Sequence, residues 1–113
     1  MLNQSIIVGR LVKDPELRET ETGHKVTNIL LAVPRSYKNI NGQYDTDFIN
    51  CVLWRGVAES TTEYCKKGDL LGVKGRIQTR DIELPDESFR TEMELVAERV
   101  TFLSSRKSQK IEE

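Results

Sequence analysis

The segment DFINCVLW, residues 47–54, decides the fold of this chain. It is rich in β-branched and aromatic residues and follows a turn-forming Asn-Gly pair, a pattern that predicts a β-strand. Side chains alternate between the two faces of a strand. The isoleucine, cysteine and leucine at positions 49, 51 and 53 therefore share one apolar face, which we expect to face the core. Phe48 and Trp54 fall on the opposite, mixed face, where large rings are covered either by another part of the protein or by a ligand.

Four other segments have the composition of strands: residues 5–12, 25–33, 69–83 and 89–103. One helix is predicted between residues 57 and 68, where apolar side chains recur at helical spacing. Lys66 and Lys67 suit the negative end of its dipole, and Gly68 is the expected C-cap. Residues 36–43 are predicted to form a loop, since they contain turn-forming asparagines and a glycine.

The order of these segments is three strands, a short helix and two strands. With glycines at positions 9, 72 and 75 available for sharp bends, this order predicts an all-β protein. The expected architecture is a five-stranded OB-fold barrel with one short helix between the third and fourth strands. We expect residues 1–104 to form this single domain and residues 105–113 to be a short flexible C-terminal tail.

The composition fits a globular domain without a membrane anchor. Of the 113 residues, 37% are hydrophobic and 31% are charged, and no apolar run approaches the roughly 20 residues of a membrane span. The first residues lack the basic start and long apolar stretch of a signal peptide, so a cytoplasmic location is expected. Cys51 and Cys65 are too few for a zinc site and are predicted to be buried small hydrophobes. No metal or cofactor is expected.

The net charge of −1 does not indicate a polyanion partner, but the charges are unevenly distributed. Residues 1–80 hold 12 lysines and arginines against 9 acidic residues, whereas residues 81–113 hold 5 against 9. A basic body with an acidic C-terminal third favours nucleic acid, because the distribution of charge matters more than its total.

The outward faces of the third and fourth predicted strands combine aromatic rings with cations. The third strand contributes Phe48 and Trp54, and the preceding loop contributes Tyr37. Single-stranded nucleic acid needs this combination, since bases stack on rings while cations follow the phosphates. The rings could instead be covered by a subunit interface or a hairpin, and the cations could form an ordinary solvated face. The cations of this set are Arg35 and Lys38 beside Tyr37, and Lys74, Arg76 and Arg80 on the fourth strand.

The chain resembles the bacterial single-stranded DNA-binding protein (SSB) family over residues 1–103. The matching motifs, in the family's order and spacing, are IVGRL (7–11), KDPELR (13–18), DFINCVLW (47–54), YCKKG (64–68) and VKGRIQTR (73–80). The resemblance implies an OB fold, a homotetramer, and wrapping of single-stranded DNA without sequence preference. Replication, repair, recombination or natural transformation would be the setting, at the cytoplasmic nucleoid.

The resemblance also implies roles for individual residues. Three of the family's stacking aromatics fall on Tyr37, Phe48 and Trp54. Basic positions of its DNA path fall on Lys66, Lys67 and Arg80, to which we add Arg35, Lys38, Arg55, Lys74 and Arg76.

Two departures from the family pattern stand out. Ile82 occupies a position where the family usually has an aromatic, and Asp81 beside it adds a negative charge, so we expect weaker binding at that hairpin. The chain also stops without the acidic C-terminal tip through which family members recruit replication enzymes. It is expected to be a short form or a trimmed chain, without tail-mediated recruitment.

Two alternative functions remain open from the sequence. One is a primosome-type OB module that docks on replication proteins as a dimer and binds DNA as an accessory activity. The other is a metal-dependent enzyme using the acidic cluster Asp81, Glu83, Asp86 and Glu87. No histidine or nucleophile–base pair accompanies that cluster, so we expect a solvated turn and no enzymatic activity.

Overall fold

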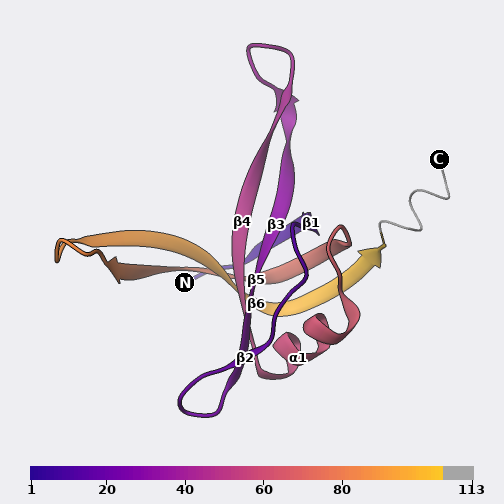
Figure 1. Ribbon diagram of the computed structural model, residues 1–113. Coiled ribbons are helices and arrows are strands. Elements are labelled where there is room, and N and C mark those ends of the chain that lie inside the picture. Colours follow the sequence, from indigo (N-terminus) through magenta and orange to yellow (C-terminus); the bar gives the residue numbers. More distant parts are fainter. Residues whose placement is uncertain (106–113) are drawn as a thin grey trace.

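The strands and the helix follow the predicted order in the computed structural model, which describes residues 1–105. The predicted tail, apart from Ser105, lies outside the described residues. The elements are β1 (Ser5–Leu11), β2 (Arg18–Glu19), β3 (Lys25–Lys38), β4 (Tyr44–Trp54), α1 (Arg55–Tyr64), β5 (Leu70–Glu83) and β6 (Phe89–Ser104). Figure 1 shows α1 beside the lower end of the barrel.

Five of the strands close into a barrel. β1 pairs antiparallel with β5 on one side and, through Arg10 and Leu11, with β3 on the other. β3 pairs with β4, and β5 pairs with β6. Closure is completed by a short parallel pairing of β4 with β6, which aligns Cys51 with Leu95 and Val52 with Val96. The predicted five-stranded OB-like barrel is confirmed, while the two-residue β2, paired with β3, was not predicted.

The apolar face predicted for β4 forms part of the core. Cys51 and Leu53 are fully buried there, together with Leu71 and Val73 of β5. Cys65 is buried as well, so the prediction for both cysteines is confirmed. Burial raises the pKa of the Cys51 thiol to about 12, because the thiolate would lose its hydration. Both thiols therefore behave as packing groups.

Two long hairpins leave the barrel in different directions. In Figure 1 the β3–β4 hairpin points upward and the β5–β6 hairpin points to the left. The loop predicted for residues 36–43 is wrong in extent, since β3 continues to Lys38 and only residues 39–43 form the turn. The Asn39 side chain closes this turn by accepting hydrogen bonds from the backbone N–H groups of Asn41 and Gln43, at 2.9 and 3.0 Å. Local side-chain bonding thus makes the turn tighter than composition suggested.

The helix is shorter than predicted. It ends at Tyr64, and Cys65 already has an extended backbone. Lys66 and Lys67 therefore follow the helix instead of occupying its last turn. The backbone N–H of Lys66 donates to the Asp69 carboxylate at 2.8 Å, and that of Lys67 donates to Asp14 at 2.7 Å. These two carboxylates take up N–H groups that would otherwise have continued the helix.

Gly75 is required where β5 passes β6. A Cβ atom at this position would lie 2.1 Å from the backbone oxygen of Val96. The register between the two strands also shifts here, between Lys74 and Gly75. The prediction that this glycine permits a sharp local bend of the barrel agrees with this close approach.

Candidate nucleic-acid interface

Phe48 and Trp54 lie on the outer surface of β4, as the alternation predicted. Their exposed fractions are 60% and 41%. Alternation places Tyr44, which is 56% exposed, on the same face of this strand. Three rings therefore line the outer face of β4, from the hairpin turn to the start of α1.

A groove lies over the barrel beside Trp54 and joins residues from five strands. We call it the Trp54 groove, and its cavity measures about 330 Å³. Arg18 and Arg80 bring two guanidinium groups to the same cavity as the indole ring. This grouping gives one aromatic surface with cations on two sides. The remaining lining residues are Thr20, Val26, Asn28, Val52, Gln78 and Glu94.

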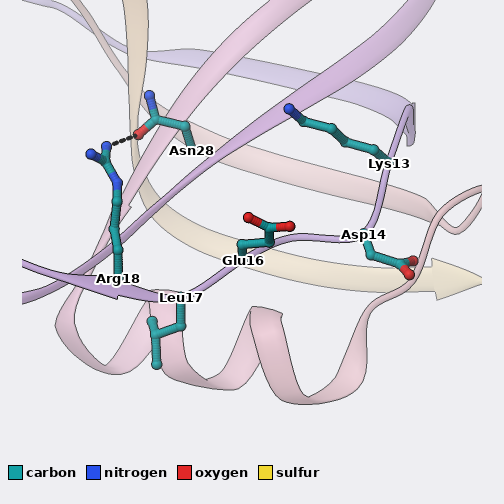
Figure 2. A pocket seen from close by; sticks show the side chains of 6 residues that line it. All are labelled: Lys13, Asp14, Glu16, Leu17, Arg18 and Asn28. Carbon is teal, nitrogen blue, oxygen red and sulfur yellow. Dashed lines mark hydrogen bonds between the residues drawn. The ribbon is translucent and has the colours of Figure 1, made fainter.

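The groove continues into a second pocket at the loop between β1 and β2. Arg18 and Asn28 line both cavities. Figure 2 shows the Arg18 guanidinium donating to the Asn28 side-chain oxygen, a bond of 3.0 Å, with Lys13 across the same pocket. The side chain of Leu17 points the other way, toward α1. The polar path from Trp54 thus extends to Lys13.

A smaller and largely apolar hollow, the Phe48 notch, lies where the two hairpins diverge. It measures about 230 Å³ and is lined by Phe48, Ile49, Asn50, Ile77, Met93, Glu94 and Leu95. Glu94 lines this notch as well as the Trp54 groove. The two hollows are therefore adjacent, with the rings of Trp54 and Phe48 in one each.

The predicted cations of β5 are distributed along its whole outer face. Arg80 lines the Trp54 groove, and Arg76 donates to the Gln78 side chain at 3.2 Å. Lys74 lies at the other end, paired in register with Ile6 and Arg99. The structure therefore brings Arg80 to the ring of Trp54 but leaves Lys74 on the face shared with β1.

Three predicted cations lie at the ends of α1: Arg55 is its first residue, and Lys66 and Lys67 follow its last turn. Arg55 directly follows Trp54 and has a positive φ of 55°. The bond from Lys67 N–H to Asp14 places the turn of Lys66 and Lys67 beside the loop that carries Lys13. None of the three lines the Trp54 groove itself.

Arg35 is engaged by carboxylates near the base of the β3–β4 hairpin. Its Nε and terminal nitrogen donate to Asp47 at 3.1 and 2.9 Å, and Asp45 lies 3.9 Å away. The hydrogen bond from Arg35 lowers the pKa of the Asp47 carboxyl, and the same bond raises the pKa of Arg35. This predicted phosphate-binding cation is thus already neutralised in the free protein.

Tyr37 and Lys38 lie at the end of β3, not in a loop. The β3–β4 register shifts between Pro34 and Lys38, so Tyr37 falls inside an irregular stretch without a residue directly opposite. Lys38 pairs with Tyr44, and its ammonium lies 5.9 Å from the centre of that ring. Tyr44, not Tyr37, therefore continues the row of Phe48 and Trp54 along β4.

The sequence matches the Single-strand binding protein family over residues 2–103, the whole barrel. This chain belongs to that family. It is 46% identical to "Single-stranded DNA-binding protein B" of Bacillus subtilis, with 97% of each chain covered. It is 48% identical to "Single-stranded DNA-binding protein" of Oceanobacillus iheyensis and 50% identical to that of Halalkalibacterium halodurans. The match covers 96% of this chain in both cases, and 68% and 65% of those longer relatives.

Sequence reasoning missed several residues that lie in or beside the candidate interface. Tyr44 has the same even-numbered parity as Phe48 and Trp54, so extending the predicted strand back to residue 44 would have found it. Lys13 and Arg18 stand in the quoted KDPELR motif, but nothing in their spacing indicated that Arg18 would lie beside Trp54 or that Lys13 would line the adjoining pocket. Glu94 could not be foreseen, because its place depends on how β6 meets β4.

Two acidic residues of the β5–β6 hairpin, Asp81 and Asp86, accept local hydrogen bonds. Thr91 donates to Asp81 at 2.8 Å, and the backbone N–H of Ser88 donates to Asp86 at 3.0 Å. Within residues 1–105 no group of three or more histidine, cysteine or acidic side chains is arranged to hold a metal ion. The same residues include no helix long and apolar enough to cross a membrane.

Proposed function

We propose that this protein binds single-stranded DNA without sequence preference and protects it. The observation that carries the proposal is the Trp54 groove, which combines an exposed indole with Arg18 and Arg80. The name that the relatives bear, single-stranded DNA-binding protein, supports it. We place this activity in the general handling of exposed DNA strands in the cytoplasm, at the nucleoid.

The mechanism combines stacking with neutralisation of phosphates. Bases stack on Trp54 and Phe48, a contact generally worth about 1–3 kcal/mol per base. Arg80 and Arg18 contact phosphates beside Trp54, and Lys13 extends the path. Duplex DNA is a poor ligand because its bases are already stacked on each other.

The other predicted cations take outer places along this path. Lys66, Lys67 and Arg55 lie beside its α1 end, and Lys38 lies at its hairpin end. Tyr37 is proposed as a further stacking ring on the hairpin. Lys74 and Arg76 are more distant contributors on β5.

We also propose that the protein acts as a homotetramer. β1 and its neighbours expose an apolar patch formed by Ile6, Val8 and Leu103 around Gly72, where Leu103 lies 3.7 Å from the place of a Cβ. Exposed aliphatic side chains gathered on one sheet face are typical of a protein–protein interface. Linked barrels would gain affinity, because each bound segment raises the effective concentration of the next.

Trp54 is the only tryptophan, so its fluorescence reports on the proposed site directly. We expect oligo-dT to quench this emission, with weaker binding as salt rises. A matched duplex should give little quenching, and equal binding of duplex would contradict the proposal.

With a labelled oligonucleotide as the probe, Trp54→Ala should lose more affinity than Ile82→Ala. The reverse order would contradict the stacking assignment.

The mass in solution tests the oligomeric state. Four protomers are expected, with and without oligo-dT. Two protomers would instead favour the primosome-type interaction module.

A further inference from the structure

Glu94 is a buried carboxylate in a surface proposed to bind a polyanion. It lies on β6 with an exposed fraction of 7% and lines both the Trp54 groove and the Phe48 notch. A negative charge at this place repels phosphates, so it does not serve the neutralisation described above. Burying a carboxylate also carries a free-energy cost unless its oxygens are paired.

Only one oxygen of this carboxylate is paired. The side-chain amide of Gln78 donates to Oε1 at 2.9 Å. Oε2 accepts no hydrogen bond from the residues that the structure describes, yet no fully buried polar side-chain atom among them lacks a partner. Oε2 is therefore not fully buried, and it is available as an acceptor in the hollows that Glu94 lines.

The residues that line the Trp54 groove determine which hydrogen-bonding groups a bound base can meet. Glu94 lines the same cavity as Trp54, so a base stacked on the indole with its hydrogen-bonding edge toward β6 would meet this carboxylate. An ionised carboxylate only accepts hydrogen bonds. The amides of Asn28 and Gln78 can donate as well as accept, so they suit any base. Cytosine carries an amino donor at C4, whereas uracil and thymine carry an oxygen acceptor there.

We propose that Glu94 reads the exocyclic amino group of a base held in the Trp54 groove, and that it gives this groove a preference for cytosine over uracil. This inference rests on the proposed binding of single-stranded DNA and concerns one position within that site. The rings still bind every base, so the preference is superimposed on binding that has no sequence requirement.

The test compares 12-nucleotide oligo-dC and oligo-dU, which differ only in base, by anisotropy of an end label at pH 8 and fixed salt. Wild type should bind oligo-dC at least about fivefold more tightly, the lower end of the discrimination expected of one good base contact. Glu94→Gln should remove most of this ratio, because an amide can satisfy either base. Glu98→Gln, on an exposed position of the same strand, should leave the ratio unchanged.

A third probe tests the donor without altering the protein. Oligo-dC in which every amino group is N4,N4-dimethylated keeps the ring but loses both donors. Wild type should bind it at least about fivefold more weakly than oligo-dC. If Glu94→Gln fails to fold, which its thermal transition would reveal, equal binding of these two oligonucleotides would still overturn the inference.

The outcomes separate the inference from the proposed function. If Glu94→Gln increased the affinity for oligo-dC and for oligo-dU by the same factor, the carboxylate would only repel phosphates. That result would overturn the base-reading role. Equal binding of oligo-dC and its dimethylated form by wild type would overturn it too. Failure of wild type to bind any of the oligonucleotides would overturn the proposed function itself.

Discussion

The guanidinium of Arg35 shows how the neighbours of a single residue change what it can do. Its charge is shared with Asp47 and, more distantly, with Asp45, so a phosphate must compete with carboxylates to reach it. Both partners are well exposed, and such ion pairs are worth little in stability. The pair therefore affects the availability of a cation more than it affects the fold.

Replacing Asp47 with asparagine should strengthen the binding of single-stranded DNA, because Arg35 becomes free to contact a phosphate. One added phosphate contact steepens the slope of log affinity against log salt by about 0.7 for a single strand. Oligo-dT titrations at several salt concentrations measure both effects. Glu59→Gln on α1 makes the same change of net charge at a distance and should leave the slope unchanged. Identical slopes in the two variants would show that Asp47 does not compete with DNA.

The positions of individual residues were predictable where the alternation of side chains along a single strand determines the face on which they lie. Phe48 and Trp54 follow from the parity of residues 47–54, and the structure confirms their exposure. Arg35 was assigned from its charge and from its neighbour Tyr37, and the sequence did not show that Asp47 would hold it. The position of Glu94 in the groove depends on the pairing of β6 with strands distant in sequence. The alternation of side chains along β6 alone does not predict it.

At the scale of elements, the strands of the β3–β4 hairpin are longer than the sequence suggested, although their register shifts between Pro34 and Lys38. Its tip carries Tyr44 with Lys38 over the ring, on the face of Phe48 and Trp54. A ring with an adjacent cation offers both a stacking surface and a phosphate contact. The hairpin thereby extends the proposed DNA path well beyond the barrel.

Tyr44→Ala should weaken binding of a long oligonucleotide, by about 1–3 kcal/mol if one base stacks there. Tyr44→Phe should retain most of the affinity, because the ring is kept. Tyr64→Ala, which removes an exposed ring from α1, is the matched control and should change little. Titrations with labelled oligo-dT measure all three. Equal losses in Tyr44→Ala and Tyr44→Phe would assign the effect to the hydroxyl group instead of the ring.

Within β5, Gly75→Ala should destabilise the barrel by about 1–3 kcal/mol, since the added methyl group meets the Val96 backbone. Gly56→Ala is the matched control, because a Cβ there has no neighbour within 4 Å. Alanine in this helical position should stabilise by about 0.5–1 kcal/mol. Denaturant unfolding measures both variants. A neutral effect of Gly75→Ala would mean that β6 can move aside at little cost.

The elements were predictable in type and order, but less so at their ends. Apolar alternation identified five strands because each has one buried face. The boundaries depend on side chains that bond to the backbone, such as Asn39 in the hairpin turn and Asp69 after α1. A periodic pattern in the sequence does not show how the residues joined by these bonds lie relative to each other.

At the scale of the whole molecule, the barrel has two distinct outer regions. One carries the Trp54 groove and the hairpins, and the other carries the apolar patch of Ile6, Val8 and Leu103. Closure of the barrel followed from the order of strands and helix. The patch could not be derived from that order, because outward aliphatic residues on β1 also occur in strands that other parts of a chain cover.

Ile6→Lys should shift the protein toward smaller assemblies, since a charge placed in the patch would have to be desolvated at an interface. The exposed fraction of Ile6 is 73%, so the folded protomer should tolerate the change. Ile40→Lys at the hairpin turn is a control at an even more exposed position and should not alter the mass. Light scattering coupled to gel filtration measures the protomer number. An unchanged mass for Ile6→Lys would locate the interface elsewhere.

The parallel pairing of β4 with β6 is a short line of the barrel, since it aligns only Cys51 and Val52 with their partners on β6. The Trp54 groove and the Phe48 notch both take residues from the two strands along this line. A DNA strand that lies across them would fasten the two hairpins to each other. Bound DNA should then stabilise the pairing of β4 with β6. It should slow amide hydrogen exchange at Cys51 and Val52 more than along β1 and β5.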